Sequence, residues 1–260
     1  MQAELVVLGS GTSMGVPTLG CECAVCRSTD ARDNRTRPSV AVQYPGEGAA
    51  RNVIIDTGPD FRQQTLREHI GRIDAVLYTH SHADHILGLD DLRPLSFKNQ
   101  EKIPLYADEE TQRVLRSVFE YTFSEASQYP HKARVALHPL RERTHLFGVD
   151  FVTVPILHGT LPTAGFRFGN AAYLTDMSDI PAASFALLED LDVLILDALR
   201  RTPHPSHSNL ETSVRFVEKI RPRRAWFTHL SHDLGHEETE RELPPHIRLA
   251  YDCQRIPIQL

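Results

Sequence analysis

Long apolar runs, blocks of basic side chains and cysteines are all scarce in this sequence. No apolar stretch approaches the roughly 20 residues that a membrane-spanning helix needs. The residues from Met1 to Gly9 lack the basic start of a secretory signal and are typical of a strand. We therefore expect a cytoplasmic protein with no membrane contact. The net charge is −6 and lysine and arginine form no block, so nucleic acid is not an expected partner beyond small cyclic nucleotides.

The length and composition predict one large domain with a substantial core. The chain has 260 residues, of which 41% are hydrophobic and 24% charged, as in ordinary soluble proteins. We expect a single domain over 1–260 whose two halves meet near 150. Apolar runs typical of strands occur at 4–8, 39–44, 52–56, 73–79, 151–157, 165–175, 192–197 and 225–228. Helical patterns occur at 61–70, 84–92, 109–123 and 208–220, the last with Ser208 or Asn209 as its cap.

The segment from Thr79 to His85 concentrates side chains that bind metals. Directly after the apolar run 73–78 it holds His80, His82, Asp84 and His85. A buried strand that ends in such a cluster delivers several ligands to one edge of a sheet. Imidazole with carboxylate suits Zn, Mn or Fe, and the lack of a nearby cysteine argues against a closed structural site. The alternative, a polar loop with incidental histidines, would leave these side chains without a packing role.

This H-x-H-x-D-H segment resembles the signature of the metallo-β-lactamase superfamily. The resemblance implies an α/β (α+β) protein folded as a four-layer αββα sandwich, with one or two metals at the edge of its sheets. It also implies an Asp after an earlier strand and a His, an Asp and a His after later strands. The ends of apolar runs supply Asp56, His158, Asp176 and His229 in that order. Each alone has an alternative as a turn or capping residue, but together they favour the superfamily.

The resemblance implies how these ligands divide between two divalent cations, zinc or manganese. One cation would take His80, His82, His158 and Asp176. The other would take Asp84, His85, His229 and the same Asp176 as a bridge. A bridging hydroxide would attack a phosphodiester phosphorus, with Asp84 in the catalytic set and Asp56 orienting a ligand histidine. The identity of the metals stays open, since such sites accept Zn, Mn and Fe.

Three of the four cysteines form a second metal-binding pattern. Cys21, Cys23 and Cys26 follow the spacing C-x-C-x-x-C, which supplies three ligands of a tetrahedral structural zinc. We expect His232 to be the fourth, because it lies three residues beyond His229 and is free to point away from the catalytic pair. The alternative is a reduced, cysteine-rich loop without metal. Cys253 is expected to be a small core residue.

With the glycine-rich stretch 9–17 before it, the cysteine loop resembles the phosphodiesterases of the carbon–phosphorus lyase pathway. That resemblance implies a small phosphorylated substrate, 5-phosphoribosyl 1,2-cyclic phosphate, opened to ribose 1,5-bisphosphate. The glycine-rich stretch has neither the Gly-Lys-Ser/Thr of a P-loop nor the dinucleotide spacing. Arg93 or Arg167 is a candidate to hold the 5-phosphate, each with a surface or salt-bridged role as its alternative. A homodimer is the expected oligomer on general grounds.

An alkoxide leaving group needs a proton, so the reaction calls for a general acid. His204 and His207 are the candidates, and both lie in the segment Pro203-His204-Pro205-Ser206-His207. The family resemblance favours His207, which directly precedes the predicted helix 208–220. The alternative is that both are exposed loop histidines.

Other functions remain open from the sequence. A tRNA 3′-processing-type nuclease shares the metal ligands, but its inserted basic arm is not evident here. A quinone-cofactor biosynthesis metalloprotein of the same superfamily also has a cysteine zinc loop, but departs from the full histidine set. A noncatalytic binding module would not need a full set of open-site ligands. The complete set here favours hydrolysis.

Overall fold

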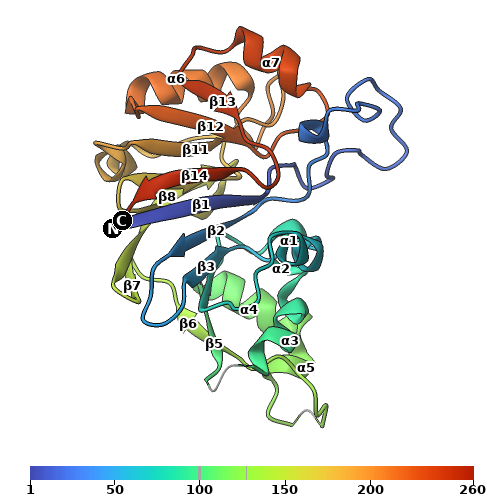
Figure 1. Cartoon of the computed structure of the whole chain (residues 1–260), viewed down its shortest axis with the longest axis vertical. Coiled ribbons are helices and arrows are strands. Elements are labelled where there is room, and N and C mark those ends of the chain that lie inside the picture. Colours follow the sequence, from blue (N-terminus) through green and yellow to red (C-terminus); the bar gives the residue numbers. More distant parts are fainter. Residues whose placement is uncertain (99–100, 127) are drawn as a thin grey trace.

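Two seven-stranded sheets stack face to face in the computed structural model, which describes residues 1–98, 101–126 and 128–260 (Figure 1). The first sheet has the order β14-β1-β2-β3-β4-β5-β6. Its strands are β1 (Gln2–Gly9), β2 (Ser39–Tyr44), β3 (Arg51–Ile55), β4 (Ala75–Leu77), β5 (Ile103–Ala107), β6 (Val135–Pro139) and β14 (Arg255–Gln259). The last strand of the chain therefore pairs with the first, and the termini lie side by side (Figure 1).

The second sheet has the order β13-β12-β11-β10-β9-β8-β7. Its strands are β7 (Arg143–Leu146), β8 (Val149–His158), β9 (Leu161–Phe168), β10 (Ala171–Leu174), β11 (Val193–Asp197), β12 (Arg224–Thr228) and β13 (Ile247–Leu249). Strands β10 to β13 run parallel, as do β3 to β6 of the first sheet. Buried on both faces, β11 reads as a continuous apolar run, as parallel strands do.

Helices cover the outer face of each sheet (Figure 1). Beside the first sheet lie α1 (Phe61–Arg67), α2 (Ala83–Ile86), α3 (Arg93–Ser96), α4 (Glu109–Val118) and α5 (Glu120–Phe123). Beyond the second sheet lie α6 (Leu210–Ile220) and α7 (His236–Glu242). Short 3₁₀ turns are η1 (Ala31–Asp33), η2 (Leu89–Leu92) and η3 (Ala182–Leu188). No helix in these described ranges is long and apolar enough to cross a membrane.

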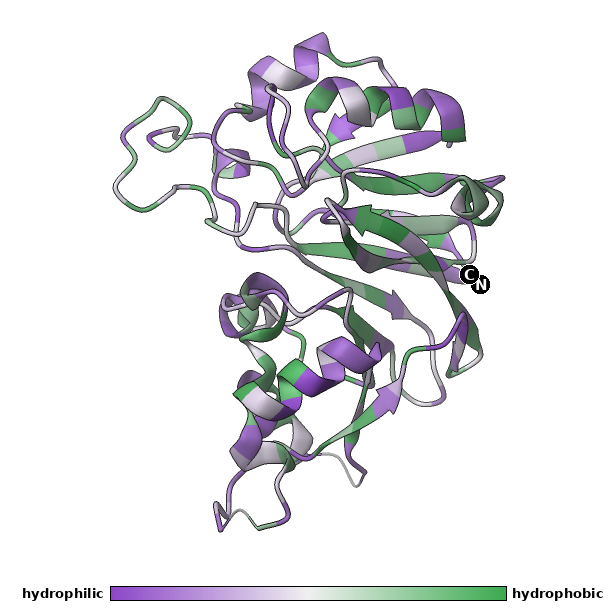
Figure 2. Cartoon of the chain, turned by 180° about the vertical axis from the view of Figure 1, so that it is seen from behind, coloured by the Kyte–Doolittle hydropathy of each residue, from purple (hydrophilic) through white to green (hydrophobic). Residues whose placement is uncertain are grey.

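The apolar core lies in three layers. One cluster, with Val42 and Phe166, fills the space between the sheets. A second, with Leu115, joins the first sheet to its helices, and a third, with Leu196 and Val217, joins the second sheet to α6. Figure 2 shows the same arrangement, with apolar residues along the strands and polar ones on the outer helix faces. The predicted four-layer αββα sandwich is confirmed.

Several predicted elements differ in detail from those observed. The pattern at 84–92 forms α2 and η2 instead of one helix, and the pattern at 109–123 is interrupted at Phe119 between α4 and α5. The run 165–175 is two antiparallel strands, because Gly169, at a φ of 55°, turns the chain between them. Asn209, not Ser208, caps α6: its side chain accepts a hydrogen bond from the Thr212 N–H.

The prediction for Cys253 is wrong. Its side chain is exposed, and the residue lies in the turn before β14 with a φ of 73°. The Cys253 N–H donates to the Val7 carbonyl, so the backbone of this turn is fixed against β1 while the thiol faces outward. An isolated cysteine carries no periodic signal, which is why its residue type alone suggested burial.

Candidate metal centre

The site side chains stand at the carboxyl ends of strands from both sheets. Asp56 follows β3, the segment 80–85 follows β4, and His158 ends β8. Asp176 and His229 follow β10 and β12. Parallel strands present their carboxyl ends at one edge of a sheet, which is where ligand sites of α/β proteins collect. The stacked sheets bring these two edges together.

Three of these residues have a left-handed backbone. The φ angles are 66° at Asp56, 50° at Asp176 and 59° at His229. A non-glycine residue in this region costs about 1–3 kcal/mol, and such residues collect where a side chain has to be aimed. Each of the three turns the chain directly after a buried strand end and points an acidic or imidazole group into the site.

The structure brings the seven predicted ligand residues into two adjacent groups. In each group the ligand atoms all lie within 4.8 Å of one another, and Asp176 belongs to both. The groups are His80, His82, His158 and Asp176, and Asp84, His85, Asp176 and His229. All these residues are buried except His82, which is exposed at the mouth of the site.

The distances within the second group match the edges of a metal coordination sphere. Two ligands that each lie about 2.0–2.1 Å from one zinc ion are roughly 3.3 Å apart. His85 Nε2 lies 3.3 Å from Asp84 Oδ2 and 3.2 Å from Asp176 Oδ1. His229 Nε2 lies 3.1 Å from the same Asp176 oxygen. In the first group His80 Nε2 lies 3.8 Å from Asp176 Oδ2.

Buried polar atoms facing these groups have no hydrogen-bond partner among the described residues. They include His80 Nε2, Asp84 Oδ2, His85 Nε2 and His229 Nε2. Leaving one such atom unsatisfied costs about 1–3 kcal/mol, so several at one point call for an additional partner. Imidazole nitrogens and carboxylate oxygens are the donor set that zinc and manganese take, and the residues therefore fit two divalent cations.

The pKa shifts of the site histidines also indicate that the carboxylates hold positive charge here. Burial by itself would lower the pKa of His229, but Asp176, Asp84 and Asp197 together outweigh burial and raise that pKa to about 10. Burial likewise opposes a charge on His85, and Asp176, Asp84 and Asp56 outweigh it and raise its pKa. The carboxylates thus hold positive charge at this point. Burial instead lowers the pKa of His80, which keeps its imidazole lone pairs available.

Asp56 supports the ligands from behind. Its Oδ2 lies 2.7 Å from His85 Nδ1 and accepts from the Thr79 hydroxyl at 2.8 Å, while Oδ1 accepts from the Thr79 N–H. A carboxylate on Nδ1 places the proton there and leaves Nε2 free to bind a metal. Burial raises the pKa of Asp56, and His85 opposes that rise.

His207 lies in the loop before α6 and packs against two of the ligand histidines. Its ring stacks on the His229 ring at 4.6 Å between centroids and lies 4.5 Å from the His158 ring. Its Nδ1 lies 2.7 Å from Oδ2 of Asp197, which is fully buried at the end of β11. The sequence reasoning missed Asp197. It has the same signal as Asp56 and Asp176, an acid that closes an apolar run, but no position in the H-x-H-x-D-H pattern points to it.

His204, the other candidate acid, lies farther from the ligands. Its ring centroid is 5.1 Å from that of His207, and the side chain is partly exposed. Burial and the neighbouring His207 lower the pKa of His204. No carboxylate contact with His204 is found in the described part of the chain.

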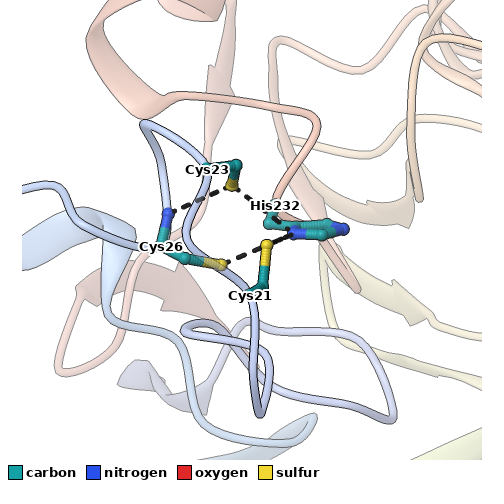
Figure 3. A group of neighbouring side chains, drawn as sticks. All are labelled: Cys21, Cys23, Cys26 and His232. Atoms are coloured by element: carbon teal, nitrogen blue, oxygen red, sulfur yellow. Dashed lines mark hydrogen bonds between the residues drawn. The ribbon is translucent and has the colours of Figure 1, made fainter.

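The cysteine loop and His232 form a separate cluster (Figure 3). His232 Nδ1 lies 3.1 Å from Cys21 Sγ, 3.6 Å from Cys23 Sγ and 3.4 Å from Cys26 Sγ. A zinc ion with Zn–S of about 2.3 Å and Zn–N of about 2.0 Å would separate these atoms by roughly 3.5 Å. One imidazole nitrogen cannot hydrogen bond to three thiols at once, so the four residues fit a tetrahedral zinc.

The thiols differ in acidity. The N–H of Cys26 donates to Cys23 Sγ at 3.4 Å and lowers the pKa of that thiol to about 6. Burial raises the pKa of Cys26 to about 11. A thiolate at Cys23 would be the first ligand available to a metal.

The two candidate arginines for a 5-phosphate have other partners. Arg93 donates to the Tyr129 hydroxyl at 3.1 Å and lies 3.5 Å from Asp90. Arg167 donates to the carbonyls of Leu187 and Gly169. The structure thus favours the alternative expectation for each, a bonded surface residue.

Fold and site together define a metallo-β-lactamase-type sandwich with two adjacent groups of metal-binding side chains. The family described as the beta-lactamase superfamily domain matches residues 51–230, and the chain belongs to this family. A crystal structure of a diphosphatase from the PhnP family is 55% identical, with a TM-score of 0.93, and the match covers 99% of this chain and 98% of that one. Zn²⁺-bound PqqB from Methylobacterium extorquens is 20% identical over 97% of this chain and 99% of that one, with a TM-score of 0.74, and so supports the fold alone.

Curated relatives carry different names. An octanoyltransferase from Porphyromonas gingivalis is 39% identical over 251 residues, which are 95% of this chain and 50% of that protein. A coenzyme PQQ synthesis protein B from Methylorubrum extorquens is 31% identical over 167 residues, 58% of this chain and 52% of that protein. The chain thus spans about half the length of these curated relatives. The family and the diphosphatase likeness support a metal-dependent hydrolase.

Proposed function

We propose that this protein is a metal-dependent phosphodiesterase, and that its substrate is 5-phosphoribosyl 1,2-cyclic phosphate, opened to ribose 1,5-bisphosphate. One observation carries the proposal: two four-residue ligand groups share Asp176, with a carboxylate-paired histidine stacked beside them. Two adjacent cations are the arrangement that proteins use for in-line displacement at phosphorus.

The chain would hold two catalytic divalent metals, zinc or manganese, and one structural zinc. When bound, the catalytic pair supplies Lewis-acid stabilisation of the phosphoryl charge and lowers the pKa of water at the site. Asp176 and Asp84 would contribute carboxylate ligands beside His85, and Asp56 fixes the tautomer of His85. The cysteine cluster lies apart from this centre and has a structural role.

His207 is the general acid in this proposal. Asp197 accepts from Nδ1, so the proton that His207 can give away is on Nε2. The ring stacks on His229 and is only slightly exposed, with a side-chain exposure of 10%. It therefore lies beside the ligand group, with a small part of its side chain accessible. A departing ribose oxygen is a poor leaving group, and a positioned acid contributes about 10²–10⁴-fold in such reactions.

A second candidate function is cleavage of a diphosphate bond. It is favoured by the likeness to a diphosphatase that matches 99% of this chain. The same paired site and the same acid would serve both reactions, because both displace an oxygen at phosphorus. The two differ in how much they need the acid, since a phosphate leaving group is stabilised without a proton far better than a sugar alkoxide.

The deciding experiment assays the metal-loaded enzyme on four substrates side by side. They are 5-phosphoribosyl 1,2-cyclic phosphate, a 2′,3′-cyclic nucleotide, bis(4-nitrophenyl) phosphate and a dinucleoside diphosphate. A strong preference for the phosphorylated ribose ring supports the substrate proposed here. Preference for the diphosphate establishes the second candidate, and activity on the aryl ester alone keeps the phosphodiesterase but overturns the substrate. Inactivity on all four with metals bound overturns the phosphodiesterase proposal.

The cellular location, the partners and the oligomeric state of the enzyme are also proposals. We infer a cytoplasmic protein that acts on small molecules, with nucleic acid limited to small cyclic nucleotides, and that forms a homodimer. The net charge of −6 supports the small-molecule partner, because an RNA-binding surface needs excess positive charge. Light scattering at several concentrations tests the dimer.

A further inference from the structure

The loop 203–206, between β11 and α6, is seated against a metal-ligand residue. The Ser206 carbonyl accepts from His158 Nδ1 at 2.6 Å. Gly159, the residue after His158, has a φ of 64°. A Cβ added to Gly159 would lie 3.3 Å from Ser206 Cβ and 3.5 Å from the Pro205 carbonyl oxygen. The loop and the turn after β8 are therefore in close contact. Pro203 and Pro205 restrict the backbone on both sides of His204.

The loop also fixes which nitrogen of His204 carries the proton. The Ser206 N–H lies 3.3 Å from His204 Nδ1, and the Ser206 hydroxyl lies at the same distance. A backbone N–H only donates, so Nδ1 accepts and has a lone pair. Neutral His204 consequently carries its proton on Nε2. Nε2 has no partner among the residues that the structure describes, and the side chain is partly exposed.

His204 and His207 are therefore built for different tasks. His207 has a buried carboxylate on Nδ1, which stabilises an imidazolium and suits an acid. His204 has a backbone donor on Nδ1, which disfavours the protonated ring and suits a neutral hydrogen-bond donor. The His204 and His207 ring centroids lie 5.1 Å apart, and the His207 ring in turn stacks on the ligand ring of His229 at 4.6 Å.

We propose that His204 is a specificity-determining residue whose Nε2–H binds an oxygen on the leaving part of the substrate. This inference rests on the proposed phosphodiesterase function. If His207 protonates the leaving oxygen, the Nε2–H of the neighbouring His204 can donate to substrate groups that lie one or two bonds beyond that oxygen. The ligand chemistry is a hydroxyl or phosphoryl oxygen of a sugar phosphate, which accepts such a bond. An aryl leaving group offers no comparable acceptor there.

The test compares His204→Ala and His204→Gln with the wild-type enzyme on two esters, 5-phosphoribosyl 1,2-cyclic phosphate and bis(4-nitrophenyl) phosphate. The alanine variant should raise KM for the ribose ester about tenfold with little change in kcat, the size expected for one hydrogen bond. KM for the aryl ester should change less than twofold. Glutamine restores an N–H donor and should recover part of the loss. His246→Ala removes an exposed histidine at the start of β13 and should change neither value.

Three results would overturn the role of His204. Equal losses on both esters mean that the variant only disturbs the loop. A fall in kcat confined to the ribose ester, with a changed pH profile, makes His204 the acid. No change on either ester removes it from the site. The proposed function fails separately, because it is overturned when the metal-loaded wild-type enzyme hydrolyses neither ester, whatever the His204 variants do.

Discussion

Nδ1 of His207 lies 2.7 Å from Oδ2 of Asp197, and the two residues belong to different elements of the fold. Asp197 is fully buried at the end of β11, whereas His207 lies in the loop before α6. The same Asp197 oxygen accepts from the Met177 N–H at 2.9 Å, directly beside the Asp176 ligand. One carboxylate thus orients the candidate acid and supports the turn that carries the shared metal ligand.

Replacing Asp197 by Asn tests this pairing. Because the same Asp197 oxygen accepts from the Met177 N–H, the amide oxygen would keep this position and still accept from Nδ1, but the charge that stabilises the imidazolium would be lost. We expect kcat on the ribose cyclic phosphate to fall about 10²-fold, within the range of general acid catalysis. The aryl ester, which leaves without a proton, should lose far less. Steady-state kinetics on both esters measures the difference, with metal content by mass spectrometry as the control.

Replacing His207 by Ala should give a stronger effect of the same kind. Turnover of the ribose ester should fall about 10²–10⁴-fold because its alkoxide departs without a proton. The limb of the pH profile that reports the protonated acid should vanish. Metal content should stay at the wild-type value, since His207 belongs to neither four-residue group. Turnover of the ribose ester within twofold of wild type would show that His207 is not the acid.

The predictable parts of this site are residues that lie close together in the sequence or that follow strands in a fixed order along the chain. His80 to His85 lie in one segment, and the other ligands close apolar runs in a fixed order. The dyad partner Asp197 also closes an apolar run, but so do many turn acids, and its contact with His207 exists only after β11 and α6 have packed. The same reason applies to the His204 tautomer, which depends on a 3.3 Å contact within one loop.

Replacing Asp56 by Asn should weaken metal binding without removing a ligand. Asp56 fixes His85 Nδ1 at 2.7 Å and lies in a fully buried position. Loss of such a supporting carboxylate typically costs about 10–100-fold in metal affinity. Titration of the metal-free variant with zinc, followed by calorimetry, measures this. Asp74→Asn is the matched control, because Asp74 is a buried acid that binds Arg51 and Arg72 away from the ligand groups.

Replacing Cys26 by Ser should separate the structural zinc from the catalytic pair. Cys26 is the buried member of the cysteine cluster. We expect the bound metal to fall by one ion per chain and the melting temperature to drop, because metal binding contributes to folding free energy. Cys253→Ser, at the exposed cysteine outside the cluster, should keep the wild-type metal content. An unchanged zinc count in the Cys26 variant would argue for the metal-free loop.

The buried Arg35 should stabilise the loop that carries His232. Its guanidinium is fully buried and donates to the carbonyls of Ser231 and Leu234, on either side of that histidine, and to Asp33 at 2.8 Å. Arg35→Met removes these donors and leaves a buried carboxylate unpaired. Breaking such a pair costs about 3–5 kcal/mol, and zinc affinity at the cysteine cluster should fall as the loop loosens.

Urea denaturation of the zinc-loaded protein measures this cost, and Arg32→Met is the control. Arg32 forms an ion pair with Asp30 at 2.6 Å, but its side chain is 38% exposed. Exposed pairs contribute about 0–1 kcal/mol, so the control should unfold near the wild-type midpoint. If both variants lost equally little stability, the buried guanidinium would not be what holds the His232 loop. If only Arg35→Met lost stability and released zinc at a lower chelator concentration, the two effects would share one cause.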